Sequence, residues 1–312
     1  MKIIFTAYFI VFIFLTESCS SHFTFKKSKL LNDYPSGSGI TYFNNRIYLI
    51  GDDAGNLLIM DTAFNITDSV QLLESQQKRI SKELKPDLEA ATVITVNNSP
   101  EILLVGSGSL APYRNTGWLI NPVNKQKTLL ALNQFYNRLK AEGIDALNIE
   151  GVTAIPAGIV LSSRGNKTLR ANYLIFTSNA FWKNQESAAV KIIKVGSNND
   201  TAFFSGVSGL EYSKLSDQLL LTVSTENTYN TIDDGDIGKS YLWIINNISA
   251  KKNISAVNPN KIIDLEKLDE RFKGHKIESV CIIAETKKEM ELVFVADDDK
   301  GSSNLFKLVL KQ

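Results

Sequence analysis

Five apolar segments of this chain each begin with a Ser or Glu, at Ser38, Glu89, Glu150, Ser208 and Glu278. Each of these residues opens a run whose apolar and β-branched composition favours a β-strand. Three carboxylates that lie close together repel one another and raise each other's pKa unless a cation lies among them. A ligand set made only of oxygen atoms favours Ca²⁺, whereas Zn²⁺ prefers His or Cys ligands. The five residues are therefore a candidate Ca²⁺ site, provided that the fold gathers them. The alternative is a structural role, in which each Glu accepts backbone N–H groups of neighbouring strands.

A second set of charged residues follows the apolar runs that come next in the chain. It comprises Asp52, Asp53, Arg114, Arg164, Glu226 and Asp297. Arg114 and Arg164 could orient a phosphate or carboxylate group, because guanidinium groups pair bidentately with such anions. Asp53 or Asp297 could act as a general base toward a metal-bound water. The competing interpretation is turn chemistry, since Asp side chains and Gly are common between strands.

Other chemistries find little support in the sequence. The chain has 2 His residues, so a His-rich metal site is excluded. No Gly-x-Ser-x-Gly turn stands between a strand and a helix, which argues against a serine hydrolase of that type. With 34 basic and 33 acidic side chains the net charge is +1, so no nucleic-acid partner is expected. The partner that remains is a small anionic ligand or substrate.

The five segments recur about every 50 to 70 residues as the first strand of a longer unit. A second and a third apolar run follow in each unit. Weaker fourth runs stand at 69–73, 127–132, 188–195 and 261–265, and the fifth unit lacks one. The segment 23–31 supplies the missing strand if the two ends of the chain pair, which removes free sheet edges. The sequence therefore predicts an all-β, five-bladed β-propeller of four-stranded antiparallel blades closed by the N-terminal strand, with six blades as the alternative.

In such a propeller the first strand of each blade is innermost and lines the central channel. The start of that strand and the loop after the second strand lie on the same face of the disc. We therefore expect the five Ser and Glu residues to converge on the channel axis, with the charged loops around them.

One helix is expected between the second and third units. Apolar residues at helical spacing run from Leu132 to Leu139, Asn133 can cap the N-terminus, and Gly143 can end the helix. Cys281 lies in an apolar strand, where a small buried thiol is favoured over a nucleophile.

The N-terminus has the pattern of a bacterial signal peptide, with a basic second residue and an apolar run too short to span a bilayer. Cys19 then resembles the lipidated residue of a lipobox, although Glu17 and the spacing from Leu15 depart from the usual pattern. Ordinary signal-peptide cleavage is the alternative. We therefore expect a signal peptide (1–18), a lipidated tether (19–22) and a single propeller domain (23–312).

This organisation predicts a protein held in the bacterial cell envelope by a lipid anchor in the membrane. Ser20 follows the modified cysteine and does not resemble an inner-membrane retention signal, which favours the outer membrane.

The order Ser, Glu, Glu, Ser, Glu resembles that of the calcium-activated apyrase family, whose five-bladed propeller draws one Ser or Glu from each blade to an axial Ca²⁺. The stretch from Ser38 to Gly55 looks like the first blade of that family. The chain is also similar to the phytase-like propellers of bacterial envelopes. The resemblance implies Ca²⁺ as cofactor and a metal-dependent hydrolase of phosphoesters or related anionic esters. A non-enzymatic propeller that binds a small anion, a glycan or a protein is the alternative.

Overall fold

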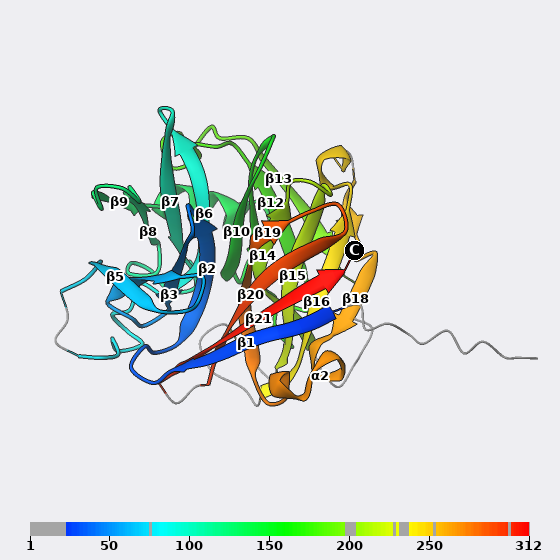
Figure 1. Cartoon of the computed structure of the whole chain (residues 1–312). Coiled ribbons are helices and arrows are strands. Elements are labelled where there is room, and N and C mark those ends of the chain that lie inside the picture. The colour runs from blue at the N-terminus through cyan, green and yellow to red at the C-terminus, as the bar shows by residue number, and fades with distance from the viewer. Residues whose placement is uncertain are drawn as a thin grey trace, which may run out of the picture.

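Strands that follow one another in the chain pair into five sheets, as Figure 1 shows for the computed structural model. The structure describes residues 23–74, 77–196, 204–226, 229–230, 237–251, 254–298 and 301–311. Each sheet is one blade built on four antiparallel strands, and one sheet carries a short fifth strand in addition. The sequence prediction of an all-β, five-bladed propeller is therefore confirmed, and the six-bladed alternative is wrong.

The first three blades use consecutive strands. Blade 1 consists of β2 (Gly37–Phe43), β3 (Arg46–Gly51), β4 (Asn56–Asp61) and β5 (Ile66–Gln71). Blade 2 consists of β6 (Leu88–Val96), β7 (Ser99–Gly106), β8 (Thr116–Ile120) and β9 (Lys127–Ala131). Blade 3 consists of β10 (Ile149–Ile155), β11 (Gly158–Ser163), β12 (Asn172–Thr177) and β13 (Val190–Val195).

The last two blades depart from simple chain order. Blade 4 consists of β14 (Phe204–Ser213), β15 (Gln218–Glu226), β16 (Ile237–Asn246) and β18 (Lys261–Asp264). Between β16 and β18 the chain adds β17 (Ala256–Val257), which pairs in parallel with β13 as a fifth strand of blade 3. Blade 5 consists of β19 (Lys276–Glu285), β20 (Glu289–Asp297), β21 (Ser303–Lys311) and β1 (Phe23–Leu31).

The ring closes where the two ends of the chain meet. Strand β1 pairs antiparallel with β21, and Figure 1 shows the blue strand beside the red one. The N-terminal strand therefore completes blade 5, as the sequence predicted. Such closure leaves no blade without its fourth strand.

Five hydrophobic clusters form the core, and each lies between two adjacent blades. One cluster, for example, packs Tyr48 and Leu57 of blade 1 against Leu104 and Trp118 of blade 2. The other four join blades 2 and 3, 3 and 4, 4 and 5, and 5 and 1. Because the apolar faces of every blade are covered by its neighbours, burial stabilises the ring only when all five blades are present.

Helix α1 (Asn133–Ala141) connects blades 2 and 3 and buries Phe135, Tyr136 and Leu139 in their shared cluster. The expected cap is wrong, because Leu132 takes the N-cap position and no side chain caps the helix. Asn133 instead accepts a hydrogen bond from Asn115 at 2.9 Å. Three short helical turns complete the described elements: η1 (Ile248–Ala250), α2 (Leu265–Leu268) and η2 (Glu270–Phe272).

A β-bulge interrupts the innermost strand of every blade at the same place. The residues passed over in the pairing with the second strand are Ser38, Glu89, Glu150, Ser208 and Glu278. A bulge re-aims the side chain of the extra residue and bends its strand. The repeated Ser or Glu in the sequence therefore marks five equivalent bulges at one end of the channel.

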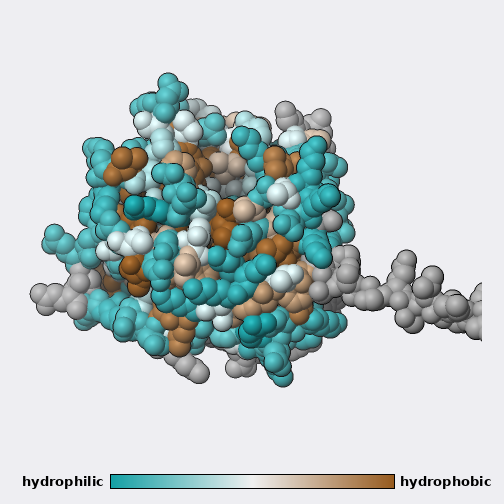
Figure 2. Space-filling view, in the orientation of Figure 1, coloured by the Kyte–Doolittle hydropathy of each residue, from teal (hydrophilic) through white to brown (hydrophobic). Residues whose placement is uncertain are grey.

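Cys281 is a free, buried thiol in β19, as expected, and burial raises its pKa well above the usual value. Among the described residues, no helix is long and apolar enough to cross a membrane. On the face shown in Figure 2, hydrophilic residues predominate and hydrophobic ones lie in separate groups.

Candidate functional site

The three bulged glutamates lie close enough to act on one another electrostatically. Burial, and then the negative charge of Glu150, raise the pKa of Glu89 well above its usual value. Burial also raises the pKa of Glu150 to about 8, with Arg164 opposing the change and Glu278 adding to it. The fold thus brings carboxylates of blades 2, 3 and 5 together at the end of the channel where their strands begin.

The two serines of the ring use their hydroxyl groups to join neighbouring blades. Ser38 Oγ donates to the carbonyl oxygen of Leu88 at 2.5 Å. Ser208 Oγ donates to the carbonyl oxygen of Ile277 at 2.7 Å. Each acceptor directly precedes the bulged Glu of the next blade. These hydroxyl groups therefore fix the backbone from which Glu89 and Glu278 project.

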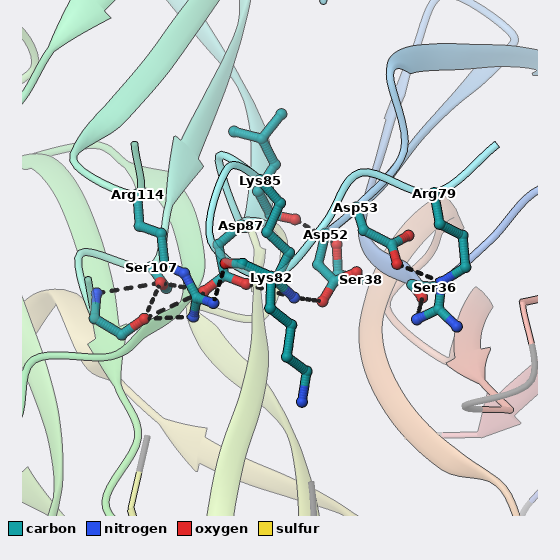
Figure 3. Close-up of polar contacts among 12 residues, drawn as sticks. Ser36, Ser38, Asp52, Asp53, Arg79, Lys82, Lys85, Asp87, Ser107 and Arg114 are labelled. Atoms are coloured by element: carbon teal, nitrogen blue, oxygen red, sulfur yellow. Dashed lines mark hydrogen bonds and ion pairs between the residues drawn. The ribbon is translucent and has the colours of Figure 1, made fainter. Parts of the chain in front are cut away.

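The first charge cluster, shown in part in Figure 3, consists of Asp52, Lys85, Asp87, Glu89 and Arg114. The Lys85 ammonium pairs with Asp52 and lies 2.7 Å from Asp87 Oδ1. Arg114 Nη1 lies 2.8 Å from Asp87 Oδ2. One carboxylate oxygen from each of Asp52, Asp87 and Glu89 lies within 4.8 Å of the others. These three acidic oxygens are close enough to share one cation, and the Lys85 ammonium already pairs with two of the three carboxylates.

The pKa shifts show how unevenly the cations are shared within the first charge cluster. Burial opposes ionisation of Asp87, but Lys85 and Arg114 hold its pKa below the usual value. Burial raises the pKa of Asp52 in spite of Lys85, and the charges of Asp53 and Asp87 add to the rise. Asp52 Oδ1 is buried and accepts no hydrogen bond from the residues that the structure describes. Asp52 and Glu89 are therefore the carboxylates of this cluster whose negative charge the neighbouring cations balance least.

The second charge cluster consists of Glu150, Arg164, Glu226, Lys276 and Glu278. Lys276 Nζ lies 2.6 Å from Glu226 Oε1 and 3.0 Å from Glu278 Oε1. Arg164 Nη2 lies 3.0 Å from Glu226 Oε2. Although burial opposes it, this pairing holds the pKa of Glu226 below its usual value. Glu150 accepts a hydrogen bond from outside the cluster, from Asn148 at 2.5 Å.

Each cluster contains three carboxylates and two cationic side chains. When all ten groups are ionised, each cluster therefore carries one excess negative charge, and the mouth of the channel carries two. Glu89 and Glu150 have the most strongly raised pKa values of the six carboxylates, so their negative charges are the ones that the cations of the clusters leave unbalanced. Two protons or one divalent cation would neutralise it.

A cavity of about 350 Å³ lies beside the first charge cluster. Its lining includes Asp52, Asp53, Arg79, Lys85 and Asp297. Arg79 Nε lies 2.5 Å from Asp53 Oδ2, and Figure 3 shows this pair next to Asp52. The cavity is therefore lined both by cationic groups and by carboxylates, and one of these carboxylates, Asp52, is also a candidate metal ligand.

The catalytic and substrate-binding residues predicted from the sequence lie in two different settings. Asp53 and Asp297 line the same cavity. Arg114 and Arg164 are buried, and each pairs with a carboxylate instead of facing an open mouth. Cys19, which was predicted to be lipidated, lies outside the described residues.

Sequence reasoning missed four charged residues at the mouth of the channel: Arg79, which pairs with Asp53, and Lys85, Asp87 and Lys276 of the two charge clusters. Asp87 and Lys276 stand two residues before Glu89 and Glu278, and Asn148 stands two residues before Glu150. The two-residue spacing recurs in three blades and was the available signal, although Asp87 and Asn148 stand just before strands β6 and β10 and not on them. Arg79 and Lys85 come from the loop between blades 1 and 2 and carry no such signal.

Comparisons with known proteins agree with the fold and assign no activity. A family model described as a family of unknown function (DUF6929) matches residues 33–310. The structure is similar to that of a glutaminyl cyclase from Myxococcus xanthus, with a TM-score of 0.50, 9% identity, and coverage of 93% of this chain and 97% of that chain. It is also similar to a streptogramin B lyase, with a TM-score of 0.38, 8% identity, and coverage of 92% and 97%. No protein with a curated description matches the sequence significantly. The resemblance to apyrases and phytase-like propellers stays a prediction.

Proposed function

This chain belongs to a family of unknown function, DUF6929, and we propose that the mouth of its channel binds Ca²⁺ next to a pocket for a small anion. The observation that carries the proposal is the excess of two negative charges on the carboxylates of the two charge clusters, of which four are buried and two, Asp52 and Glu89, are half-buried. Protons balance that excess only below the raised pKa of Glu150, about 8, and of Glu89. A single divalent cation balances it over a wider pH range.

The residues present fit a hard divalent cation. Asp52, Asp87 and Glu89 would supply ligand oxygens, and the buried Asp52 Oδ1 has no hydrogen-bond donor among the described residues. Glu150 adds negative charge from the neighbouring blade. Oxygen ligands from loops and bulges favour Ca²⁺, since Mg²⁺ demands stricter octahedral geometry. Lys85 keeps Asp52 and Asp87 together, so the ligand oxygens are already close.

Calorimetric titration of chelator-treated protein with CaCl₂ tests the cation site. We expect saturable binding, together with a melting temperature that rises with Ca²⁺ and falls with chelator. Glu89→Gln should weaken binding at least tenfold, whereas Glu186→Gln, which changes an exposed carboxylate, should leave it unchanged. No binding heat and one melting temperature under all conditions would refute the site.

The pocket beside the cation supports binding of a phosphate-type anion. Arg79, Lys82 and Lys85 line it, and a metal ion held through Asp52 would add positive charge. Titration with inorganic phosphate in the presence of Ca²⁺ tests this part. Arg79→Ala should weaken phosphate binding severalfold, and equal affinity in the variant would remove Arg79 from the pocket's function.

Hydrolysis of phosphoesters is the second candidate function, because Asp53 and Asp297 line the same pocket and either could accept a proton from water. Nucleoside diphosphates and aryl phosphates, each with Ca²⁺ and with chelator, are the substrates to test. Ca²⁺-dependent release of phosphate that Asp297→Asn abolishes would support an enzyme. No release under any condition would leave a non-enzymatic binding protein.

The envelope location is a proposal from the sequence of the first residues. Mass spectrometry of protein extracted from bacterial membranes should find a lipid on Cys19, and Cys19→Ala should move the protein to the soluble fraction. An unmodified N-terminus after cleavage elsewhere would contradict lipidation.

A further inference from the structure

A second cavity, of about 670 Å³, lies at the end of the channel opposite the charged mouth. It is bounded by the later residues of the innermost strands β2, β6, β10 and β14, one from each of four blades. Thr153 lines it and stands three residues after the bulged Glu150, about 10 Å along β10 at ~3.3 Å per residue. This cavity, which we name the Glu211 cavity, is therefore separate from the proposed cation site.

The innermost strands place equivalent residues around the Glu211 cavity. The third residue after the bulge is Thr in blades 1, 2 and 3 and Glu in blade 4: Thr41, Thr92, Thr153 and Glu211. The Thr153 hydroxyl oxygen accepts a hydrogen bond from the Tyr212 amide of blade 4 at 3.1 Å. Glu211 Oε1 accepts the equivalent bond from the Ile282 amide of blade 5, also at 3.1 Å. Because one oxygen is enough for this tie between blades, the carboxylate that replaces a hydroxyl leaves Oε2 for a ligand in the cavity.

Glu211 is half-buried, and the described groups that act on it are backbone amides and one further carboxylate. Burial raises the pKa of its carboxyl group to about 8, and the negative charge of Glu285 adds to the rise. The cationic residue among those described along the cavity wall, Lys214, is exposed. A carboxylate withdrawn from water without a counter-ion is unfavourable, and a nearby positive charge favours its ionised form. A positively charged ligand would therefore be stabilised beside Glu211.

The other walls of the Glu211 cavity favour an organic cation over a metal ion. Glu211 is the single carboxylate among the described residues that line it, whereas a calcium or magnesium site needs several oxygen ligands in one place. Tyr42, Phe43 and Tyr212 give the cavity aromatic surface, which attracts organic cations and packs against apolar groups. Its volume lies within the range of roughly 300 to 1,000 Å³ that is usual for small-molecule sites.

We propose that the Glu211 cavity binds a small organic amine with an aromatic or apolar body. The ammonium group pairs with the Glu211 carboxylate, and the body packs against Tyr42, Phe43 and Tyr212. The ligand then supplies the counter-ion that the described part of the chain does not give to Glu211. The site is on the opposite face of the disc from the proposed Ca²⁺ site and does not depend on it.

Calorimetric titration of the purified full chain tests the proposal with two amines, tryptamine and benzylamine. Tryptophol and indole-3-acetate are the neutral and the anionic analogues of tryptamine. We expect saturable binding of at least one amine, at least tenfold weaker binding of the neutral analogue, and no binding of the anion. Saturating Ca²⁺ should leave the amine affinity unchanged. Loss of amine binding in Ca²⁺ would place the amine at the acidic mouth and overturn the proposal.

Three variants test the assignment of the residues. Glu211→Gln keeps an acceptor for the Ile282 amide and should weaken tryptamine binding at least tenfold. Tyr42→Leu removes aromatic surface and should weaken it severalfold. Glu289→Gln, which removes an exposed carboxylate at the start of β20 on the same face of the disc, should leave the affinity unchanged.

Thermal unfolding of the same variants shows whether the binding data come from folded protein. Tryptamine should raise the melting temperature of the wild type and of Glu289→Gln, and not that of Glu211→Gln. Equal binding of tryptophol and tryptamine, undiminished binding by folded Glu211→Gln, or no saturable binding of either amine would overturn the proposal.

Discussion

Replacing Glu150 by Gln separates the two ways in which the mouth of the channel can neutralise its excess charge. The side chain is buried, 8% exposed, and burial raises its pKa from 4.5 to about 8. The unfolded chain releases the Glu150 proton near pH 4.5, whereas the cation-free folded protein holds it to about pH 8. Below pH 4.5 Glu150 is protonated in both states, so its titration does not change the free energy of unfolding. The stability of the cation-free protein therefore falls as pH rises through this window.

The size of this effect follows from the same two pKa values. A difference of one pKa unit corresponds to about 1.4 kcal/mol, so complete ionisation of Glu150 costs up to about 5 kcal/mol. The glutamine side chain of the variant keeps the shape of Glu150 and the acceptor for Asn148, but it carries no proton to lose. In chelator the variant should therefore match the wild type near pH 5 and exceed its stability by a few kcal/mol near pH 9.

Saturating Ca²⁺ should reverse that order. The wild type keeps the full negative charge that attracts the ion, whereas the variant lacks one of the two excess charges and binds it more weakly. Urea unfolding at pH 5, 7 and 9, with Ca²⁺ and with chelator, measures both effects, and Glu186→Gln serves as the control. Parallel pH curves for Glu150→Gln and wild type in chelator would refute the assignment of the buried proton. An equal gain from Ca²⁺ in both proteins would refute a cation site that depends on the charge of Glu150.

Three further outcomes follow from the structure. Burial raises the pKa of Glu211 to about 8, so the wild type should lose up to ~1.4 kcal/mol of unfolding free energy per pH unit between about pH 4.5 and 8. Glu211→Gln can still accept the 3.1 Å hydrogen bond from the Ile282 amide and should not show this loss. Urea midpoints that shift with pH as in the wild type would contradict this. Lys85→Met leaves the carboxylates of Asp52 and Asp87 without their shared cation, so it should lower the free energy of unfolding by about 3 to 5 kcal/mol in chelator and by less in Ca²⁺. An equal decrease with and without Ca²⁺ would count against the cation site. Gly206→Ala would put a Cβ atom in steric overlap with the Arg164 guanidinium group and should lower the free energy of unfolding by about 1 to 3 kcal/mol; an unchanged urea midpoint would show that the guanidinium group moves without cost.

The repeating strand pattern made the fold predictable in detail. The closing strand was predicted at 23–31 and is β1, Phe23–Leu31. The fourth strands at 127–132 and 261–265 are close to β9 and β18. Short runs of apolar residues carry this information, because the inner strands bury both faces between blades. Strand β17 was missed, since a two-residue strand that crosses to another blade has no periodicity to detect.

What the sequence by itself determined about this protein is the number of blades and the position of one Ser or Glu at the start of each innermost strand. Those properties depend on local patterns that repeat along the chain. Only the tertiary structure decided which cations meet the carboxylates, because Lys85 pairs across a loop and Lys276 pairs with Glu226 from another blade. The pKa of each carboxyl group depends on burial and on charges that are far away in sequence. The excess of two negative charges at the mouth could therefore be seen only from the closed ring, in which these side chains meet.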